Sequence, residues 1–214
     1  MPETTLWMIR HGETAWNLER RFQGQIDIPL NCTGREQAEF LACRLRDDHE
    51  SRPFAAIYTS DLTRARETAA PIAARLGIAP TIDTSMRERH FGVLGALTPE
   101  EMAQSQPHEF AQWKARNPDH VIEGGESLRN LYQRVVQGMT RIATQHPGAQ
   151  VIVVTHGGVL DVAYRAAKAM DLSLPRKHDL LNASINRIRY RAGAFSLESW
   201  GDVSHLDVEA FDEA

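Results

Sequence analysis

The sequence predicts an α/β fold: a three-layer α/β/α sandwich with a mostly parallel central sheet and an antiparallel hairpin at its C-terminal edge. Short apolar runs of strand length alternate with longer segments of helical periodicity. The runs at 6–9, 55–58 and 151–154 are apolar at nearly every position, as expected of strands that are covered on both faces. Towards the C-terminus, apolar residues alternate with other residues on both sides of Ala192-Gly193, which predicts the hairpin.

Four helices are expected to connect these strands. The first begins with a capping box, Thr33 with Glu36, and the second is capped by Ser60 or Asp61 and ends at Gly77. After each start, apolar residues return at helical spacing and form one face. These faces consist of Ala38, Leu41 and Leu45 in the first helix, and of Leu62, Ala65, Ala69, Ile72 and Leu76 in the second.

The other two helices flank the strand run at 151–154. One follows Glu126-Ser127 and stops at Pro147-Gly148, and the other begins at Gly157-Gly158 and continues to about Met170. The apolar face of the former consists of Leu128, Leu131, Val135, Met139 and Ile142. Strands and helices therefore alternate in the manner of a doubly wound sheet.

The segment 98–125 interrupts this alternation. It opens with a short helix at Thr98-Pro99, where proline takes the first helical position, and then shows little periodicity. We interpret the segment as an insertion that covers the site and shapes substrate choice; the alternative is a packed connector that touches no ligand. Residues 1–206 are expected to form one domain that includes this insertion, and 207–214 an acidic tail.

The composition bears on compartment and partners. The 214 residues include 24 Lys and Arg against 28 Asp and Glu, so the net charge is −4 and no basic field predicts a nucleic-acid or membrane partner. Cys32 and Cys43 suggest no disulfide framework, and no signal peptide or long apolar run is present, so we expect a cytoplasmic protein. An edge strand leaves room for a homodimer.

Two of the expected strands end at a histidine beside a glycine: His11 and His156. Ligands of open α/β sheets bind beyond the carboxyl ends of the strands, so both side chains should share one crevice. A neutral imidazole is a competent nucleophile near neutral pH, provided that its other nitrogen donates a hydrogen bond, for which a backbone carbonyl is expected. His156 precedes a helix N-terminus, whose free N–H groups favour an anion.

Two arginines are candidates for binding that anion. Arg10 directly precedes His11 and offers a planar set of donors that matches phosphate or carboxylate. Arg64 lies in the first turn of the helix expected after Ser60-Asp61, away from its apolar face, and can point back over the strand end. The alternative for Arg64 is a solvated surface side chain.

Five motifs, in order along the chain, resemble those of a known family. Arg10-His11-Gly12-Glu13-Thr14, followed by Asn17 and Gln23-Gly24, resembles the signature of the histidine phosphatase superfamily, which includes the cofactor-dependent phosphoglycerate mutases. The resemblance extends from residue 6 to about residue 206. It continues through the stretch 60–69, Glu88-Arg89-His90-Phe91-Gly92, Gly125-Glu126-Ser127-Leu128 and Thr155-His156-Gly157.

The resemblance implies the family fold and a role for each matching residue. His11 would be the nucleophile that becomes phosphohistidine, and Glu88 the general acid that protonates the departing oxygen and then activates water. The pKa of Glu88 should therefore be raised by burial. The resemblance also implies catalysis of phosphoryl transfer on a small phosphorylated metabolite without a metal ion or cofactor. The phosphoryl group would be held by Arg10, Asn17, Gln23, Gly24, Arg64, His156 and Gly157.

Three departures favour the phosphatase branch over the mutases. Leu97-Thr98-Pro99 stands where mutases typically have a lysine, and Trp113 precedes Lys114-Ala115-Arg116 instead of two adjacent arginines. Gly157-Gly158-Val159-Leu160 resembles the phosphatase branch, since mutases tend to have Asn-Ser after this histidine. Fewer cations retain a bisphosphate less well, so we expect hydrolysis of small phosphate monoesters.

Two other functions remain open at this point. Glu88-Arg89-His90-Phe91-Gly92 is mutase-like, because Arg89 could hold a substrate carboxylate, so phosphoglycerate mutase is the first alternative. A non-catalytic protein that binds phosphorylated ligands is the second. Phe91 and Trp113 could form an apolar wall for the leaving group or simply pack in the core, and His90 is a weak candidate for the pocket mouth.

Overall fold

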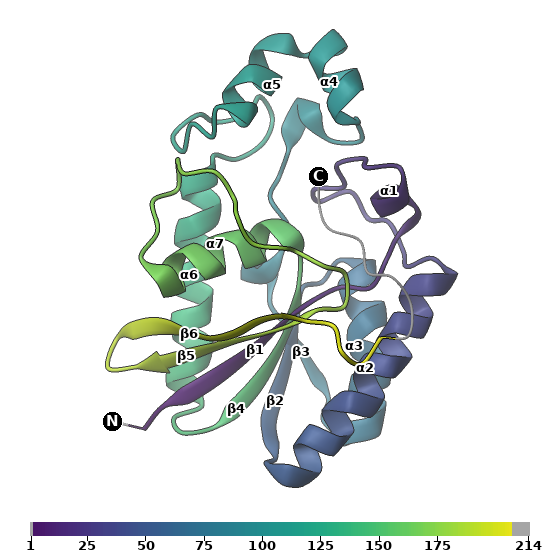
Figure 1. The fold of residues 1–214 in the computed structure, drawn as a ribbon, viewed down its shortest axis with the longest axis vertical. Helices are drawn as coiled ribbons and strands as arrows, with labels where there is room; N and C mark the ends of the chain where they lie inside the picture. Colours follow the sequence, from purple (N-terminus) through teal and green to yellow (C-terminus); the bar gives the residue numbers. More distant parts are fainter. Residues whose placement is uncertain (1, 207–214) are drawn as a thin grey trace.

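The computed structural model describes residues 2–206. The expected acidic tail at 207–214 lies outside the described residues. Within 2–206, the chain forms a six-stranded sheet with helices on both faces (Figure 1). The predicted α/β sandwich is confirmed.

The sheet has the strand order β3-β2-β4-β1-β5-β6. β1 pairs in parallel with β4, β4 with β2, and β2 with β3, whereas β5 and β6 run antiparallel at one edge. The mostly parallel sheet and its antiparallel edge hairpin are therefore as predicted. The strands are β1 (Thr4–Arg10), β2 (Phe54–Thr59), β3 (Pro80–Ile82), β4 (Gln150–Thr155), β5 (Ile185–Arg191) and β6 (Ala194–Asp202).

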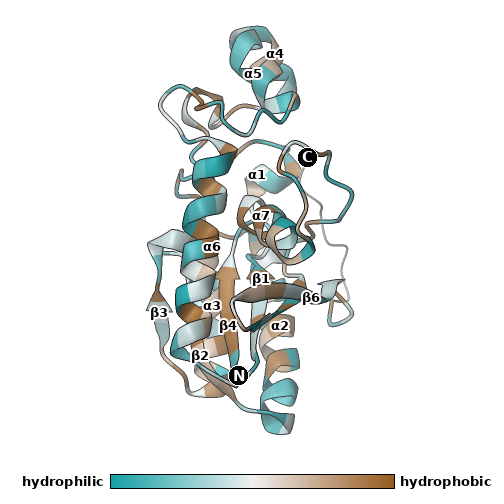
Figure 2. Cartoon of the chain, turned by 90° about the vertical axis from the view of Figure 1, so that its left-hand side faces the viewer, coloured by the Kyte–Doolittle hydropathy of each residue, from teal (hydrophilic) through white to brown (hydrophobic). Residues whose placement is uncertain are grey.

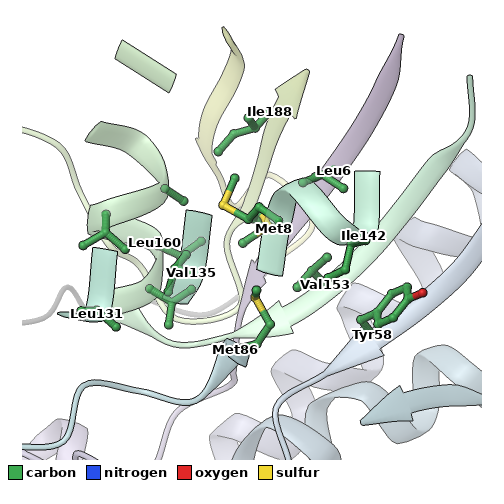
Figure 3. Close-up of a cluster of buried hydrophobic side chains, with 14 of the residues drawn as sticks. Leu6, Met8, Tyr58, Met86, Leu131, Val135, Ile142, Val153, Leu160 and Ile188 are labelled. Carbon is green, nitrogen blue, oxygen red and sulfur yellow. The ribbon is translucent and has the colours of Figure 1, made fainter. Parts of the chain in front are cut away.

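Alternate residues of the central strands enter two separate cores. In β1, Leu6 and Met8 face the core under α6 (Leu128–Gln145) and α7 (Gly157–Lys168). Trp7 and Ile9 face the core under α2 (Cys32–Ser51) and α3 (Thr63–Leu76). Figure 3 shows the first of these cores, where strand side chains meet Val135 and other residues of the covering helices. Apolar burial on both faces explains why strands β1 and β4 are apolar throughout.

Seven α-helices and two short 3₁₀ helices are present in the described part of the chain. Helix α6 carries apolar and polar residues in alternating patches along its length, as an amphipathic helix does (Figure 2). The helices are α1 (Ala15–Leu18), α2 (Cys32–Ser51), α3 (Thr63–Leu76), α4 (Pro99–Ser105), α5 (Pro107–Lys114), α6 (Leu128–Gln145) and α7 (Gly157–Lys168), with 3₁₀ turns η1 (Thr84–Met86) and η2 (Gly92–Leu94). None of these helices is long and apolar enough to span a lipid bilayer.

Two predicted helix starts were wrong. Asn31, not Thr33, caps α2, because its side chain accepts the N–H of Gly34 at 2.8 Å and also donates to Glu13. The N-cap of α3 is Leu62, whose side chain makes no capping bond. A distant carboxylate, Asp27, accepts the first N–H of α3 instead, so neither Ser60 nor Asp61 is the cap.

The segment 98–125 contains α4 and a second helix, α5, that the weak periodicity did not predict. Both helices lie at the top of the molecule in Figure 1, at the same end as α1. Below them, Phe22, Phe91, Leu94, Met102 and Ile122 form a third, smaller apolar core. The short edge strand β3 was also missed, because its three residues are exposed and carry no buried pattern.

Candidate active site

His11 and His156 follow neighbouring parallel strands. β1 and β4 pair in register up to Arg10 and Thr155, so the next residue of each strand emerges at the same edge of the sheet. The two imidazole rings have their centroids 5.2 Å apart, and both side chains are buried. The two histidines therefore lie side by side, as expected of residues that follow neighbouring strands.

The His11 ring is oriented by the backbone. Its Nδ1 lies 2.7 Å from the carbonyl oxygen of Gly12, which assigns the proton to Nδ1 and leaves a lone pair on Nε2. Gly12 itself donates its N–H to the Thr68 hydroxyl of α3 at 3.0 Å. A Cβ at Gly12 would lie 2.4 Å from the carbonyl oxygen of Gly34, so only glycine allows this loop to pack on α2.

Burial keeps both histidines neutral. Desolvation, followed by the charges of Arg64 and Arg10, lowers the pKa of His11 well below its usual value, although the bond to Gly12 opposes this. Desolvation also lowers the pKa of His156, with Arg64 and His11 as the next causes. No protein hydrogen bond within residues 2–206 engages either ring nitrogen of His156. A neutral nucleophile and an available neighbouring donor are thus present together.

These lowered pKa values predict that acid weakens the fold before the carboxylates titrate. Below about pH 6.5 an unfolded histidine takes up a proton that the buried ring refuses, so the free energy of unfolding should fall by about 1.4 kcal/mol per pH unit for each such ring. His205, whose pKa burial also lowers, acts in the same direction. Urea unfolding at about pH 7.5 and 5.5 measures the slope, which should become shallower in His156→Ala. An equal slope in that variant would contradict the assignment.

Arg10 and Arg64 stand beside the two histidines and are fully buried. Arg64 donates to the carbonyl oxygens of Gly24 at 2.6 Å and Ile26 at 2.9 Å, which holds its guanidinium against the 23–26 turn. Arg10 donates to the carbonyl of Leu180. The surface alternative for Arg64 is therefore wrong, since its side chain is 0% exposed. Two guanidinium groups held by backbone carbonyls form a positive site for an anion.

Glu88 reaches the same pocket from the loop before η2. One carboxylate oxygen accepts the N–H of Arg89 at 2.6 Å, and the other accepts the N–H of Gly158 in the first turn of α7 at 2.9 Å. A Cβ at Gly158 would lie 2.3 Å from a carboxylate oxygen, so any larger residue there would displace the Glu88 side chain. Arg134 of α6 fixes the backbone, because it donates to the carbonyl of Glu88 at 2.8 Å. The raised pKa expected for Glu88 stays a prediction.

A cavity of about 30 Å³ brings most of the predicted site residues together. It is lined by Arg10, His11, Trp16, Asn17, Arg20, Arg21, Phe22, Gln23, Gly24, Arg64 and Glu88. His156 and Gly157 do not line it. His156 is completely buried and lies against His11, and Gly157 is the buried first residue of α7.

A second cavity, of about 80 Å³, lies between the 98–125 segment and helices α6 and α7. Phe22 lines both cavities. Three arginines face the second one, and Phe91 and Trp113 line it as well as packing in the small third core. It is lined by Phe22, Arg89, Phe91, Gln112, Trp113, Arg116, Asn117, His120, Leu128, Leu131, Gly158, Asp161, Arg176 and Leu180.

Several supporting residues escaped the sequence analysis. Asn182 donates to the carbonyl of His11 at 3.0 Å and to the side-chain oxygen of Asn17 at 3.4 Å, which connects the loop before β5 to His11. Thr68 and Arg134 hold Gly12 and Glu88 from the inner side of α3 and α6. These residues act through the backbone of others, so neither their type nor their spacing in the sequence carries a signal. Asn17 was predicted to bind the phosphoryl group. Its side-chain oxygen accepts hydrogen bonds from the N–H and the hydroxyl of Thr14, each at 3.0 Å.

Comparison with known proteins places this geometry in a family. The model of the histidine phosphatase superfamily (branch 1) matches residues 6–203. A protein of Arabidopsis thaliana named metal-independent phosphoserine phosphatase is 40% identical over 211 residues, which is 97% of this chain and 85% of that protein. Phosphoglycerate mutase-like protein 4 of the same plant is 39% identical over 95% of this chain and 87% of its own length.

Among solved structures, Bacillus stearothermophilus YhfR superimposes with a TM-score of 0.84 at 36% sequence identity. The match covers 94% of this chain and 98% of that structure.

Proposed function

The chain belongs to the histidine phosphatase superfamily, and from this premise we propose that it is a metal-independent phosphatase that hydrolyses small phosphate monoesters through a phosphohistidine on His11. The observation that carries the proposal is the hydrogen bond from Nδ1 of His11 to Gly12, which frees Nε2 beside two buried guanidinium groups. The non-catalytic alternative is disfavoured, since nucleophile, acid and phosphoryl-binding cations all meet in one pocket.

The first half of the reaction transfers the phosphoryl group to the protein. Nε2 of His11 attacks phosphorus, the bond from phosphorus to the leaving oxygen breaks, and Glu88 gives its proton to that oxygen. Arg10, Arg64 and His156 stabilise the negative charge on the phosphoryl oxygens throughout. No step in this scheme requires a bound metal ion.

The second half regenerates the free site. The Glu88 carboxylate takes a proton from a water molecule, the water oxygen attacks phosphorus, and the bond from phosphorus to Nε2 breaks. Inorganic phosphate leaves and His11 is neutral again. The neutral state agrees with the lowered pKa of this ring in the free protein.

The leaving group is proposed to be a small alcohol that carries a carboxylate. Arg89, Arg116 and Arg176 line the cavity next to the phosphoryl site, and its volume of about 80 Å³ suits a group of a few atoms. Burial lowers the pKa of Arg89 to about 10, so this side chain is still charged at neutral pH. The relative named for phosphoserine acts, by that name, on a substrate of this kind.

Mutase activity is the second candidate, because Arg89 does line the leaving-group cavity and one relative is named phosphoglycerate mutase-like. A mutase must retain its bisphosphate intermediate while that intermediate reorients in the site. The lysine typical of mutases is replaced by Leu97-Thr98-Pro99, and the two adjacent arginines are replaced by Lys114-Ala115-Arg116. Hydrolysis is therefore favoured.

A substrate panel with a chelator present tests these proposals. We expect phosphate release from phosphoserine and 3-phosphoglycerate to exceed that from phosphoethanolamine, which lacks the carboxylate, by at least about tenfold in kcat/KM. Arg176→Gln should narrow that gap and leave p-nitrophenyl phosphate hydrolysis unchanged. Equal rates on phosphoethanolamine would contradict the carboxylate assignment, and isomerisation of 3-phosphoglycerate faster than phosphate release would favour the mutase. Cytoplasmic location and a homodimer stay predictions.

A further inference from the structure

Arg20 lies at the cavity beside His11, which we call the phosphoryl cavity, and its side chain has no partner within residues 2–206. Its side chain is exposed and lines the cavity together with His11, Arg64 and Glu88. Among residues 2–206, no hydrogen bond or ion pair engages its guanidinium group. The adjacent Arg21 lines the same cavity but is neutralised, because it pairs with Glu101 at 2.6 Å and Glu19 at 3.1 Å.

The backbone at Arg20 is in an uncommon conformation. Its φ angle is +53°, in the left-handed region that a residue with a Cβ rarely adopts. The turn is held by N–H bonds from Arg20 to the carbonyl of Asn17 at 3.1 Å and from Arg21 to that of Trp16 at 2.9 Å. Strain of this kind is concentrated at functional sites, where the structure around it maintains it. At this position the cavity is lined by an arginine, although glycine would adopt the same backbone conformation without strain.

Arg20 would add a donor on the exposed side of the phosphoryl group. In the phosphohistidine state, the phosphoryl group carries close to two negative charges and Glu88 carries one, while the His11 ring keeps its Nδ1 proton and carries one positive charge. Arg10 and Arg64 balance the remaining charge, and both are buried. Arg20 lines the same cavity and is exposed, so its planar donors can reach the phosphoryl oxygens from another side.

We propose that Arg20 is a phosphoryl-binding residue that closes on the phosphoryl oxygens from the solvent side and stabilises the phosphohistidine intermediate. This role rests on the proposed function, since it assigns an additional ligand to the same phosphoryl group. The role of Arg20 requires only that a phosphate dianion binds in the cavity, whereas the proposed function also requires turnover. Binding of inorganic phosphate therefore tests it even without turnover.

The test uses three variants of the full chain. Arg20→Gly removes the charge and relieves the left-handed strain, so its Tm should equal or exceed that of the parent, while calorimetric affinity for inorganic phosphate falls about tenfold. Arg20→Lys restores charge without the planar donors and should recover part of the affinity. Arg66→Gln removes an exposed arginine of α3 outside the phosphoryl cavity and controls for net charge. Its phosphate affinity should be unchanged.

Turnover adds a second measurement. After a denaturing alkaline quench, the fraction of protein that carries phosphohistidine should be smaller in Arg20→Gly than in the parent, and p-nitrophenyl phosphate hydrolysis should lose about tenfold in kcat/KM. Parent-like phosphate affinity in Arg20→Gly, or an equal loss in Arg66→Gln, overturns the assignment. If the parent shows no hydrolysis, the proposed function fails, and the phosphate affinities still decide the role of Arg20.

Discussion

Replacing His11 with alanine should reduce kcat by about 10⁴-fold or more on every phosphate monoester. The variant lacks the only atom that the mechanism uses to receive the phosphoryl group, Nε2 of the ring whose Nδ1 is held by Gly12. Labelling followed by a denaturing alkaline quench should then detect no acid-labile phosphate on the protein. Both measurements together separate a lost nucleophile from a merely slowed release of product.

Controls are needed because the His11 side chain is buried and its removal leaves space. Inorganic phosphate should still raise the Tm of His11→Ala, since Arg10 and Arg64 are unchanged. His108, which is 77% exposed in its side chain, provides the matched substitution, and His108→Ala should keep parental activity. Acid-labile phosphate in His11→Ala would place the intermediate on another residue and end the proposed scheme.

The second large effect is expected at Glu88, and it should depend on the leaving group. Glu88→Ala removes the proton donor, so hydrolysis of an alkyl ester such as phosphoserine should fall by about 10³-fold. p-Nitrophenolate leaves without protonation, so the formation of phosphohistidine from p-nitrophenyl phosphate should lose far less. A burst of p-nitrophenol, followed by slow turnover, is expected because the same residue activates water in the second step.

Single-turnover kinetics on both substrates measure this difference. The comparison with Asp83→Asn, a buried carboxylate that pairs with Arg141 away from the cavity, distinguishes chemistry from a loss of folded protein. Equal losses of phosphohistidine formation on the two esters would show that Glu88 is not the acid.

The sequence predicted the central fold well because burial leaves a direct trace in residue type. Strands β1 and β4 are covered on both faces, and their uninterrupted apolar runs follow from that. The positions of His11 and His156 at strand ends could then be paired by the rules of parallel sheets. Arg64 and Glu88 were harder to identify as site residues from the sequence. Only the family resemblance distinguished Glu88 from a surface glutamate.

What the sequence did not predict depends on distant partners. Asp27 caps α3 from another segment, and Asn31 begins α2 early while it contacts Glu13. Asn182 and Arg134 support catalytic groups through backbone carbonyls, which accept hydrogen bonds from many residue types. Arg20 was passed over because an exposed arginine has no pattern until the cavity beside it is known.

The small apolar core beneath α4 and α5 is separate from the two cores that cover the sheet. Phe22 belongs to that core and also lines both cavities, whereas the buried core members Met102 and Ile122 line neither cavity. Under the proposed function, substitutions in this core would alter which alcohol is accepted and would leave intact the two cores of the sheet that positions His11. This separation would let the accepted substrate change during evolution through the upper segment alone, while the residues around His11 stay the same.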